Sequence, residues 1–146
     1  MFLTEEEMVI ALVSLIKNND TKIDCLKECI LKQEVEGLIG RPDLLLKNRN
    51  KKIITIELKL KNWKRALAQA YKYKSFSDIS YVCMDEKNIN PALKNIELFK
   101  QYNVGLISIN NKNKVKLHFS PKIKKAYVKE LYSNATEKFD NFAEAY

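Results

Sequence analysis

The sequence contains few of the residue types on which several classes of protein depend. Three cysteines, Cys25, Cys29 and Cys83, are an odd number without a paired metal spacing. We therefore expect free thiols in a reducing compartment rather than a disulfide framework or a four-cysteine cluster. The one histidine, His118, cannot by itself form a histidine metal cluster. Its place on the polar face of a predicted edge strand indicates an ordinary exposed side chain.

Long apolar segments are also absent. No stretch approaches the ~20 apolar residues that a membrane-spanning helix needs. The chain begins with an acidic run at residues 5–7, whereas a signal peptide begins with basic residues. The sequence therefore predicts a cytoplasmic protein with no membrane partner. Its 146 residues suit one domain, 1–146, with a single core.

Basic residues outnumber acidic residues by 26 to 18, which gives a net charge of +8. This excess favours a polyanionic partner such as nucleic acid, although many basic proteins bind none. The bias is stronger between residues 47 and 74 than in the chain as a whole. The basic residues of that region are Lys47, Arg49, Lys51, Lys52, Lys59, Lys61, Lys64, Arg65, Lys72 and Lys74.

Two apolar runs in this part of the chain predict neighbouring strands. The first run covers residues 40–46 and includes Asp43. In the second, residues 53–60, apolar residues alternate with polar ones, which is the period of a strand and places Glu57 and Lys59 on the same face. The short polar link between the runs predicts a hairpin that brings Asp43 toward Glu57.

Asp43 and Glu57 would then be two carboxylates facing each other. Such a pair repels unless a proton or a cation lies between them. Mg²⁺ suits this place because it prefers oxygen ligands, is held by one or two carboxylates, and takes further oxygens from a phosphate. Lys59 is placed to orient or deprotonate an attacking water, or to neutralise charge on the phosphate. For this strand alone, a solvated face with an internal ion pair is the simpler alternative.

At these residues the sequence resembles the PD-(D/E)xK nuclease superfamily, whose signature is Pro-Asp, a hairpin and Glu-x-Lys. The signature appears here as Pro42-Asp43 and Glu57-Leu58-Lys59. The resemblance implies that Asp43 and Glu57 hold catalytic Mg²⁺, for which Mn²⁺ can substitute, and that Lys59 serves the nucleophile. It also implies that the backbone carbonyl of Leu58 completes the metal shell.

A helix is predicted directly after this strand, from Asn62 to Tyr73. Its buried stripe is expected to consist of Trp63, Ala66, Leu67, Ala70 and the stem of Lys74. Arg65, Gln69 and Tyr73 recur at i, i+4 and i+8 on another face. The Gln-x-x-x-Tyr pattern resembles that of RecB-type nuclease domains, which implies a place for Gln69 beside the metal site and for Tyr73 near the substrate backbone. An amphipathic helix with solvated polar residues is the alternative.

The sequence leaves the further acidic ligand of the metal open. Many members of the superfamily carry one on the first helix, which a Thr4 capping box and the apolar spacing predict over residues 5–17. Negative charge at that end also favours the helix dipole, and we prefer this simple capping explanation for its glutamates. A predicted strand from Ile30 to Glu36 would put two more glutamates on one face. The candidates are Glu5, Glu6, Glu7, Glu34 and Glu36, and the predicted metal set includes Glu34.

The remaining chain predicts alternating strands and helices. A buried strand at 78–84 contains Cys83 and is followed by a helix from Ala92 to about Tyr102. A strand at 104–109 and a hairpin strand at 115–119 come next. With the resemblance, this order implies an α/β fold with a restriction-endonuclease-like core, about residues 30–109, in which helices flank a central mixed β-sheet.

The C-terminal part, residues 121–146, is predicted to be helical because Ser120-Pro121 is a typical helix start. Its apolar stripe consists of Tyr132, Ala135, Phe139, Phe142 and Tyr146. This stripe must be covered by the domain itself or by a second subunit, and intramolecular packing is preferred for its first half.

The sequence thus predicts a Mg²⁺-dependent nuclease that hydrolyses phosphodiester bonds of nucleic acid, DNA in preference to RNA, in repair, recombination or defence. The predicted nucleic-acid contacts are Arg41, Lys61, Lys64, Arg65, Lys72 and Tyr73. One alternative is a catalytically inactive nucleic-acid-binding module of the same fold. Another is a Holliday-junction or restriction-type endonuclease that acts as a homodimer.

Overall fold

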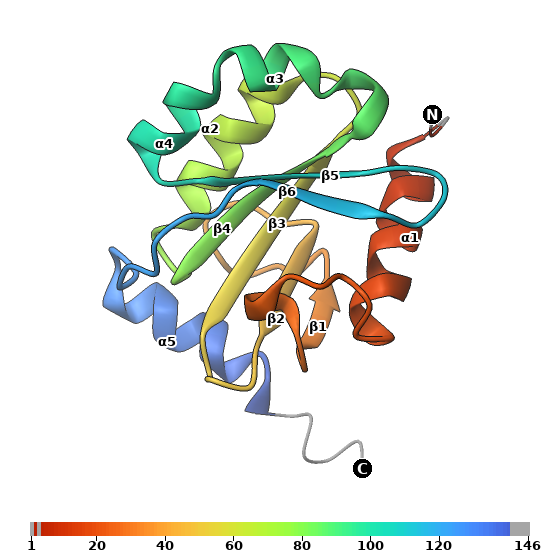
Figure 1. Cartoon of the computed structure of the whole chain (residues 1–146). Helices are drawn as coiled ribbons and strands as arrows, with labels where there is room; N and C mark the ends of the chain where they lie inside the picture. Colours follow the sequence, from red (N-terminus) through yellow and green to blue (C-terminus); the bar gives the residue numbers. More distant parts are fainter. Residues whose placement is uncertain (1, 3, 141–146) are drawn as a thin grey trace.

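One mixed β-sheet of six strands organises the computed structural model, which describes residue 2 and residues 4–140 (Figure 1). The strands lie side by side in chain order. They are β1 (Ile30–Gln33), β2 (Leu44–Lys47), β3 (Ile53–Lys59), β4 (Ile79–Asp85), β5 (Gly105–Ile109) and β6 (Val115–Phe119). The β3–β4 and β4–β5 pairs are parallel, and the other three pairs are antiparallel. The predicted α/β class with a mixed sheet is confirmed.

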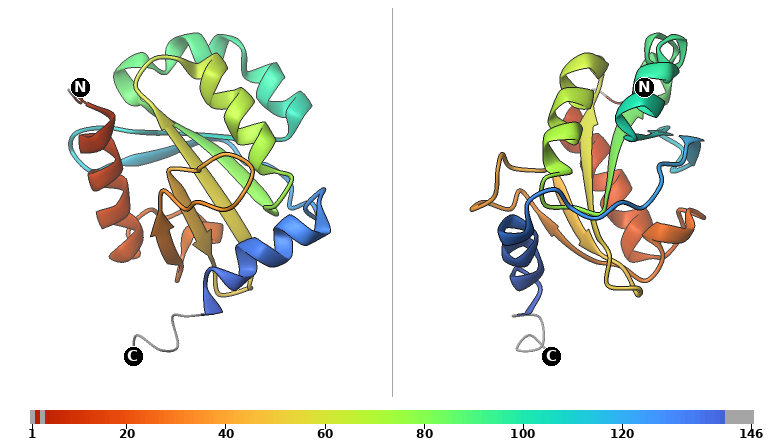
Figure 2. Two further views of the ribbon diagram at one scale, coloured as in Figure 1. Left: turned by 180° about the vertical axis from the view of Figure 1, so that it is seen from behind. Right: turned by 90° about the vertical axis from the view of Figure 1, so that its left-hand side faces the viewer.

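Helices cover both faces of this sheet. They are α1 (Glu5–Lys17), α2 (Trp63–Tyr73), α3 (Asn90–Lys94), α4 (Ile96–Tyr102) and α5 (Lys129–Glu137), with short 3₁₀ turns at Asp24–Leu26 and Glu86–Asn88. The apolar side of α1 packs on one face, and α2, α3 and α4 pack on the other. Helix α5 lies on the same side as α2 (Figure 2). In the described part of the chain, the helices are all too short or too polar to cross a membrane.

The first helix occupies the predicted range. The Thr4 side chain accepts a hydrogen bond from the Glu7 backbone N–H at 3.1 Å, which satisfies one of the amides at the start of the helix. Met8, Leu12 and Ile16 recur at helical spacing and are buried against the sheet. Thr4 and this spacing together explain why α1 starts where it does.

The β3–α2–β4 unit also follows the prediction. The Asn62 side chain accepts a hydrogen bond from the Arg65 N–H at 3.1 Å and begins α2. The expected stripe is buried, and so is Lys74, whose Nζ donates to the Tyr102 and Asn103 carbonyls at 2.9 and 3.2 Å. Since β3 and β4 are parallel, α2 is the crossover between them.

Two predicted elements are shorter than expected. Strand β1 ends at Gln33 instead of continuing to Glu36, because the chain turns at Glu34, whose φ is +47°. Glu34 and Glu36 therefore do not share a strand face. The helix expected from Ala92 to Tyr102 is divided at Asn95, whose side chain donates to the Pro91 carbonyl at 2.8 Å.

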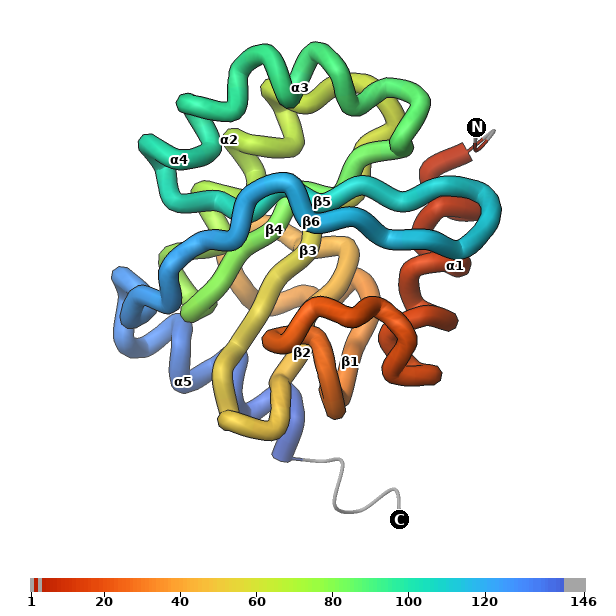
Figure 3. Tube along the Cα trace, viewed as in Figure 1, coloured from red at the N-terminus to blue at the C-terminus, as the bar shows by residue number. Residues whose placement is uncertain are grey.

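The prediction of a helix starting at Pro121 is wrong. Residues 120–128 are irregular and run from the β6 edge to α5 (Figure 3). The N–H groups of Tyr127 and Val128 donate to the Lys74 and Ser75 carbonyls at the end of α2, at 3.2 and 2.7 Å. Because these amides bond to α2, the segment does not form its own helix, and α5 begins at Lys129.

The first half of the C-terminal stripe packs within the domain, as preferred. Ala135 and Phe139 are buried, and the Tyr132 hydroxyl donates to Asp78 Oδ2 at 3.0 Å. The other two residues of the stripe, Phe142 and Tyr146, lie outside the described residues.

The β5–β6 hairpin departs from the expected pattern in two side chains. His118 is half-buried rather than exposed, with Nε2 at 2.8 Å from the Ser108 hydroxyl. Leu117 is exposed although the alternation predicts that it is buried. A register shift between Leu106 and Ile107 interrupts the pairing, and Phe119 packs with the α2–α4 layer whereas Val115 packs with the α1 layer.

The cysteines behave as the sequence indicates. None of the three is in a disulfide, and all three lie in the described part of the chain. Cys83 is fully buried in the core, as predicted. Cys25 Sγ lies 2.9 Å from the Tyr81 hydroxyl.

Candidate active site

The β2–β3 hairpin places Asp43 beside Glu57. Leu44 is paired with Ile56 in this antiparallel ladder. Asp43 precedes Leu44 and Glu57 follows Ile56, so these two residues are neighbours at the open end of the hairpin. Side chains opposite each other in an antiparallel pair project from the same face. The signature carboxylates, 14 positions apart in the sequence, therefore meet through the hairpin.

A short hydrogen bond fixes the Asp43 side chain. Its Oδ2 accepts from the Leu58 backbone N–H at 2.8 Å. The N–H and C=O of one strand residue face the same neighbouring strand, so the Leu58 carbonyl also projects toward the Asp43 side of β3. The carbonyl that the resemblance assigns to a metal is thus on the side of this carboxylate.

Glu57 is buried, with 3% of its surface exposed. The Tyr73 hydroxyl at the end of α2 donates to Glu57 Oε1 at 3.0 Å. Tyr73 is itself only 1% exposed, so the expectation that it lies at a nucleic-acid backbone is corrected. The i, i+4, i+8 pattern misplaced Tyr73 because a long side chain at the last turn of a helix can reach back along the sheet to Glu57.

Gly40 makes room for the Tyr73 ring. A Cβ at this position would lie 2.9 Å from Cε1 of Tyr73, and the φ of Gly40 is +75°. Both the close approach and the backbone conformation require glycine. Gly40 therefore connects the Pro42-Asp43 loop to the tyrosine that holds Glu57.

Burial raises the pKa values of both carboxyl groups. Burial, followed by the charge of Asp43, raises the pKa of Glu57 from 4.5 to about 7. The Tyr73 hydroxyl and the Lys59 charge act in the opposite direction. Burial likewise raises the pKa of Asp43, with the Leu58 N–H and Lys59 opposing it. A cation between the carboxylates would relieve this cost.

Lys59 extends the site toward α1. Its Nζ lies 3.7 Å from Glu5 Oε2. Its charge also lowers the pKa values of Asp43 and Glu57, so it acts on all three carboxylates. The predicted Asp, Glu and Lys triplet is thus brought together, and the first turn of α1 joins it.

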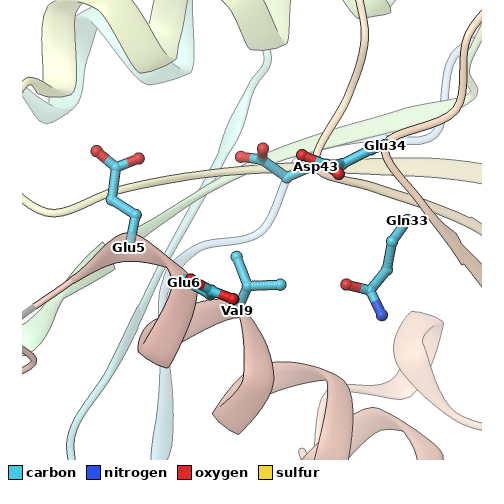
Figure 4. Close-up of a pocket in the computed structure, with 6 residues that line it drawn as sticks. All are labelled: Glu5, Glu6, Val9, Gln33, Glu34 and Asp43. Atoms are coloured by element: carbon cyan, nitrogen blue, oxygen red, sulfur yellow. The ribbon is translucent and has the colours of Figure 1, made fainter.

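An acidic cavity of about 490 Å³ opens beside Asp43. Glu5 and Glu6 of α1 reach it from one side and Glu34 from another (Figure 4). Glu5 and Glu34 also raise the pKa of Asp43. Among the five candidate acids, the cavity is lined by Glu5, Glu6 and Glu34, whereas Glu7 and Glu36 are not part of its lining. Three of the five candidate glutamates therefore line the cavity, and the choice of a metal ligand among the five stays a prediction.

The donor set fits a hard divalent cation held mainly by water and substrate. Within residue 2 and residues 4–140, no three His, Cys, Asp or Glu side chains are grouped closely enough to enclose a metal ion by themselves. Mg²⁺ needs only one or two carboxylates, since it keeps several waters and takes phosphate oxygens. Asp43, Glu57 and the Leu58 carbonyl meet that requirement.

Gln69 is half-buried on α2. Its Oε1 is buried and has no hydrogen-bond partner among the described residues. A buried amide oxygen without a donor is unusual in a folded protein. Its assignment to the site stays a prediction.

The predicted nucleic-acid contacts are mostly accessible. The exposed ones are Arg41, Lys61, Lys64, Arg65 and Lys72. Arg41 pairs with Glu36 at 3.2 Å and with Glu34 at 3.9 Å, so it bridges the loop that leads into Asp43. Lys64 lies 5.8 Å from the Trp63 ring.

No protein-family model and no curated protein matches the sequence. Solved structures with a similar fold include SPO1766, a protein of unknown function from Silicibacter pomeroyi, with a TM-score of 0.61 and 20% identity over 99% of this chain and 90% of that chain. They also include Pyrococcus furiosus SfsA in complex with Ca²⁺, with a TM-score of 0.50 and 10% identity over 82% of this chain and 65% of that chain. At these identities the likeness establishes the fold alone.

Proposed function

We propose that this protein is a divalent-metal-dependent nuclease that hydrolyses phosphodiester bonds of nucleic acid, with DNA preferred to RNA. The observation that carries the proposal is the pair of carboxylates at the end of the β2–β3 hairpin, in which Glu57 is buried and Asp43 is half-buried, with Lys59 beside it. A purely structural strand would gain by replacing Glu57 with an apolar residue, because a buried carboxylate near a second one is costly. Such a pair of perturbed groups beside a cavity is typical of a functional site.

Asp43, Glu57 and the Leu58 carbonyl are the residues that would hold the cation. When bound, Mg²⁺ or Mn²⁺ would supply Lewis-acid stabilisation of charge on the phosphate and favour deprotonation of the attacking water. SfsA, a protein of similar fold, has been solved with Ca²⁺, which supports a divalent cation in the proposal.

The side chains around the carboxylates have separate roles in this proposal. The Tyr73 hydroxyl holds Glu57 in one orientation through Oε1, and the Leu58 N–H does the same for Asp43 through Oδ2. Lys59 orients the water or neutralises charge on the phosphate, and its ion pair with Glu5 limits where its Nζ can lie. Gln69 supports the site from α2, and the exposed lysines bind the backbone.

The decisive experiment is a cleavage assay with plasmid, linear duplex, branched and single-stranded DNA, and RNA, in Mg²⁺, in Mn²⁺ and in EDTA. We expect metal-dependent cleavage of at least one substrate. Asp43→Asn, Glu57→Gln and Lys59→Ala should each reduce its rate at least about 100-fold.

Matched controls come from the exposed start of α5, whose charged side chains do not line the acidic cavity. Glu130→Gln and Lys129→Ala remove the same charges and should leave the cleavage rate unchanged. Activity that survives in both Glu57→Gln and Lys59→Ala would contradict the proposal. Salt-dependent binding without cleavage of any substrate would favour the inactive binding module.

A further inference from the structure

Three exposed tyrosines lie together on the outer side of α2 and α4. Tyr71 is 43% exposed, Tyr102 is 38% exposed and Tyr127 is 57% exposed. The ring centroid of Tyr71 lies 5.1 Å from that of Tyr102 and 6.4 Å from that of Tyr127, with both pairs edge-to-face. Aromatic side chains usually bury much of their surface, so a group of three left open to solvent needs an explanation.

An apolar groove adjoins the tyrosines. It has a volume of about 470 Å³, within the range of about 300–1,000 Å³ that is usual for ligand pockets. We call it the tyrosine groove, and its main lining residues are Trp63, Lys64, Leu67, Tyr71, Leu98 and Tyr102. Leu98 of α4 is 36% exposed in this groove.

The charges around the groove are positive. Lys64 lines it and lies over the Trp63 ring. Lys74 Nζ lies 5.6 Å from the centroid of the Tyr127 ring, and the charge of Lys124 reaches Lys74. In the part of the chain that the structure describes, no carboxylate lines the groove. A partner with flat apolar rings and a negative backbone would complement both the rings and the charges.

Along the chain, a short basic segment separates the candidate active site from the first residue of the groove. Lys59 belongs to the site, and Trp63, four residues later, lines the groove. Lys61 and Lys64 are exposed along this segment. A polyanionic strand that leaves the site past Lys61 would therefore meet the groove next.

We propose that the tyrosine groove binds the unstacked bases of single-stranded nucleic acid. The bases of a duplex stack on each other and do not present their faces to a protein side chain, whereas those of a single strand do. This inference rests on the proposed function, which gives nucleic acid as the ligand. It adds that the nucleic acid is single-stranded and that its bases bind in the tyrosine groove. It makes a single strand, or a single-stranded end next to a duplex, the substrate that the protein holds best.

The test is binding measured by fluorescence anisotropy, with a labelled single-stranded oligonucleotide and a duplex of the same length, in EDTA so that no cleavage occurs. Wild type should bind the single strand more tightly than the duplex. Tyr71→Ala and Tyr102→Ala should each weaken single-strand binding about tenfold or more, since each removes a stacking surface. Tyr71→Phe and Tyr102→Phe keep the ring and should bind like wild type.

Two further variants separate stacking from loss of structure. Ile10→Ala truncates an exposed apolar side chain on α1, on the opposite face of the sheet, and should not change binding. If Tyr71→Ala unfolds, Lys64→Glu, which reverses one exposed charge at the groove, should still weaken single-strand binding about tenfold.

The inference is overturned if both alanine variants bind the single strand as tightly as wild type. It is also overturned if they lose duplex and single-strand binding equally, or if light scattering shows a dimer that these substitutions dissociate, because a second copy would then cover the groove. Each of these results leaves the metal-dependent cleavage assay unaffected. Conversely, single-strand binding without cleavage of any substrate would support binding in the tyrosine groove and contradict the proposed nuclease activity.

Discussion

The two faces of strand β3 differ in chemistry although both are buried. Ile54, Ile56 and Leu58 pack in the apolar layer under α1. Thr55 and Glu57 lie on the opposite face and are also nearly inaccessible, at 0% and 3% exposed. Both polar side chains have hydrogen-bond partners. Thr55 Oγ1 donates to the Ser80 hydroxyl at 2.8 Å, and Glu57 accepts a hydrogen bond from the Tyr73 hydroxyl.

This comparison shows that alternation along a strand does not by itself distinguish a solvated face from a covered one. A polar residue under a helix must have a hydrogen-bond partner, since an unpaired buried group is costly. Thr55 meets this requirement within the sheet, and such a pair is close to neutral for stability. Glu57 accepts a hydrogen bond from Tyr73 but lies beside a second carboxylate, Asp43, so its burial remains costly. This cost is the reason for the role that we propose for Glu57.

The largest effect on stability is expected on the apolar face. Ile56→Ala removes a fully buried side chain opposite Leu44 and should lower the free energy of unfolding by about 2–5 kcal/mol. Urea unfolding followed by circular dichroism measures this change. Ile10→Ala, at a position that is 62% exposed, is the control and should change stability by less than about 0.5 kcal/mol. Equal effects of the two substitutions would show that the layer under α1 is not the core.

The stability of the metal-free protein is expected to depend on pH through Glu57, on the polar face of β3. The pKa of Glu57 is about 7 in the folded state against 4.5 ordinarily, so between these values the folded state binds more protons. Its stability contribution is therefore complete below pH 4.5 and is lost as pH rises to about 7 and above. The loss approaches about 3 kcal/mol.

Urea unfolding in EDTA at several pH values measures this loss. Glu57→Gln cannot ionise, so it should lack this part of the slope and be more stable than wild type at pH 8. Added Mg²⁺ at pH 8 should stabilise wild type and have little effect on the variant. Parallel pH profiles for the two proteins would contradict the assignment of Glu57 as a costly buried acid.

The smallest change in stability is expected where α2 contacts the polar face of β3. Tyr73→Phe removes the hydroxyl that donates to Glu57 and should destabilise the protein by about 1–3 kcal/mol at pH 8, where Glu57 is ionised. The loss should be smaller at pH 5, where Glu57 carries a proton. A double-mutant cycle in the Glu57→Gln background is the control, since there the substitution should cost less. The same cost in both backgrounds would show that the hydroxyl has another partner.

Local patterns in the sequence were sufficient for most of the framework. Thr4 and Asn62 cap the helices that they were expected to begin, and the polar link before Ile53 gives the predicted hairpin. These features depend on interactions between residues a few positions apart. The same patterns failed at Pro121, where the backbone pairs with the end of α2, a contact between segments about 50 residues apart.

The side-chain environment was less predictable than the framework. His118 and Tyr73 were both expected in accessible positions, and each is covered through a contact with another element. Leu117, an apolar residue of the edge strand β6, is 41% exposed. Burial of this kind depends on which elements pack together, and the periodicity of one element does not contain that information.

For the candidate site, the sequence alone determined the identity and order of Asp43, Glu57 and Lys59. It also determined the hairpin that makes the first two neighbours, because strand alternation and a polar turn are local properties. Only the tertiary structure decided that α2 covers Glu57, that Tyr73 holds it, and that Glu5, Glu6 and Glu34 rather than Glu7 or Glu36 line the acidic cavity. The reason is physical: desolvation and repulsion between charges depend on distances in space, and packing between elements remote in the chain sets those distances.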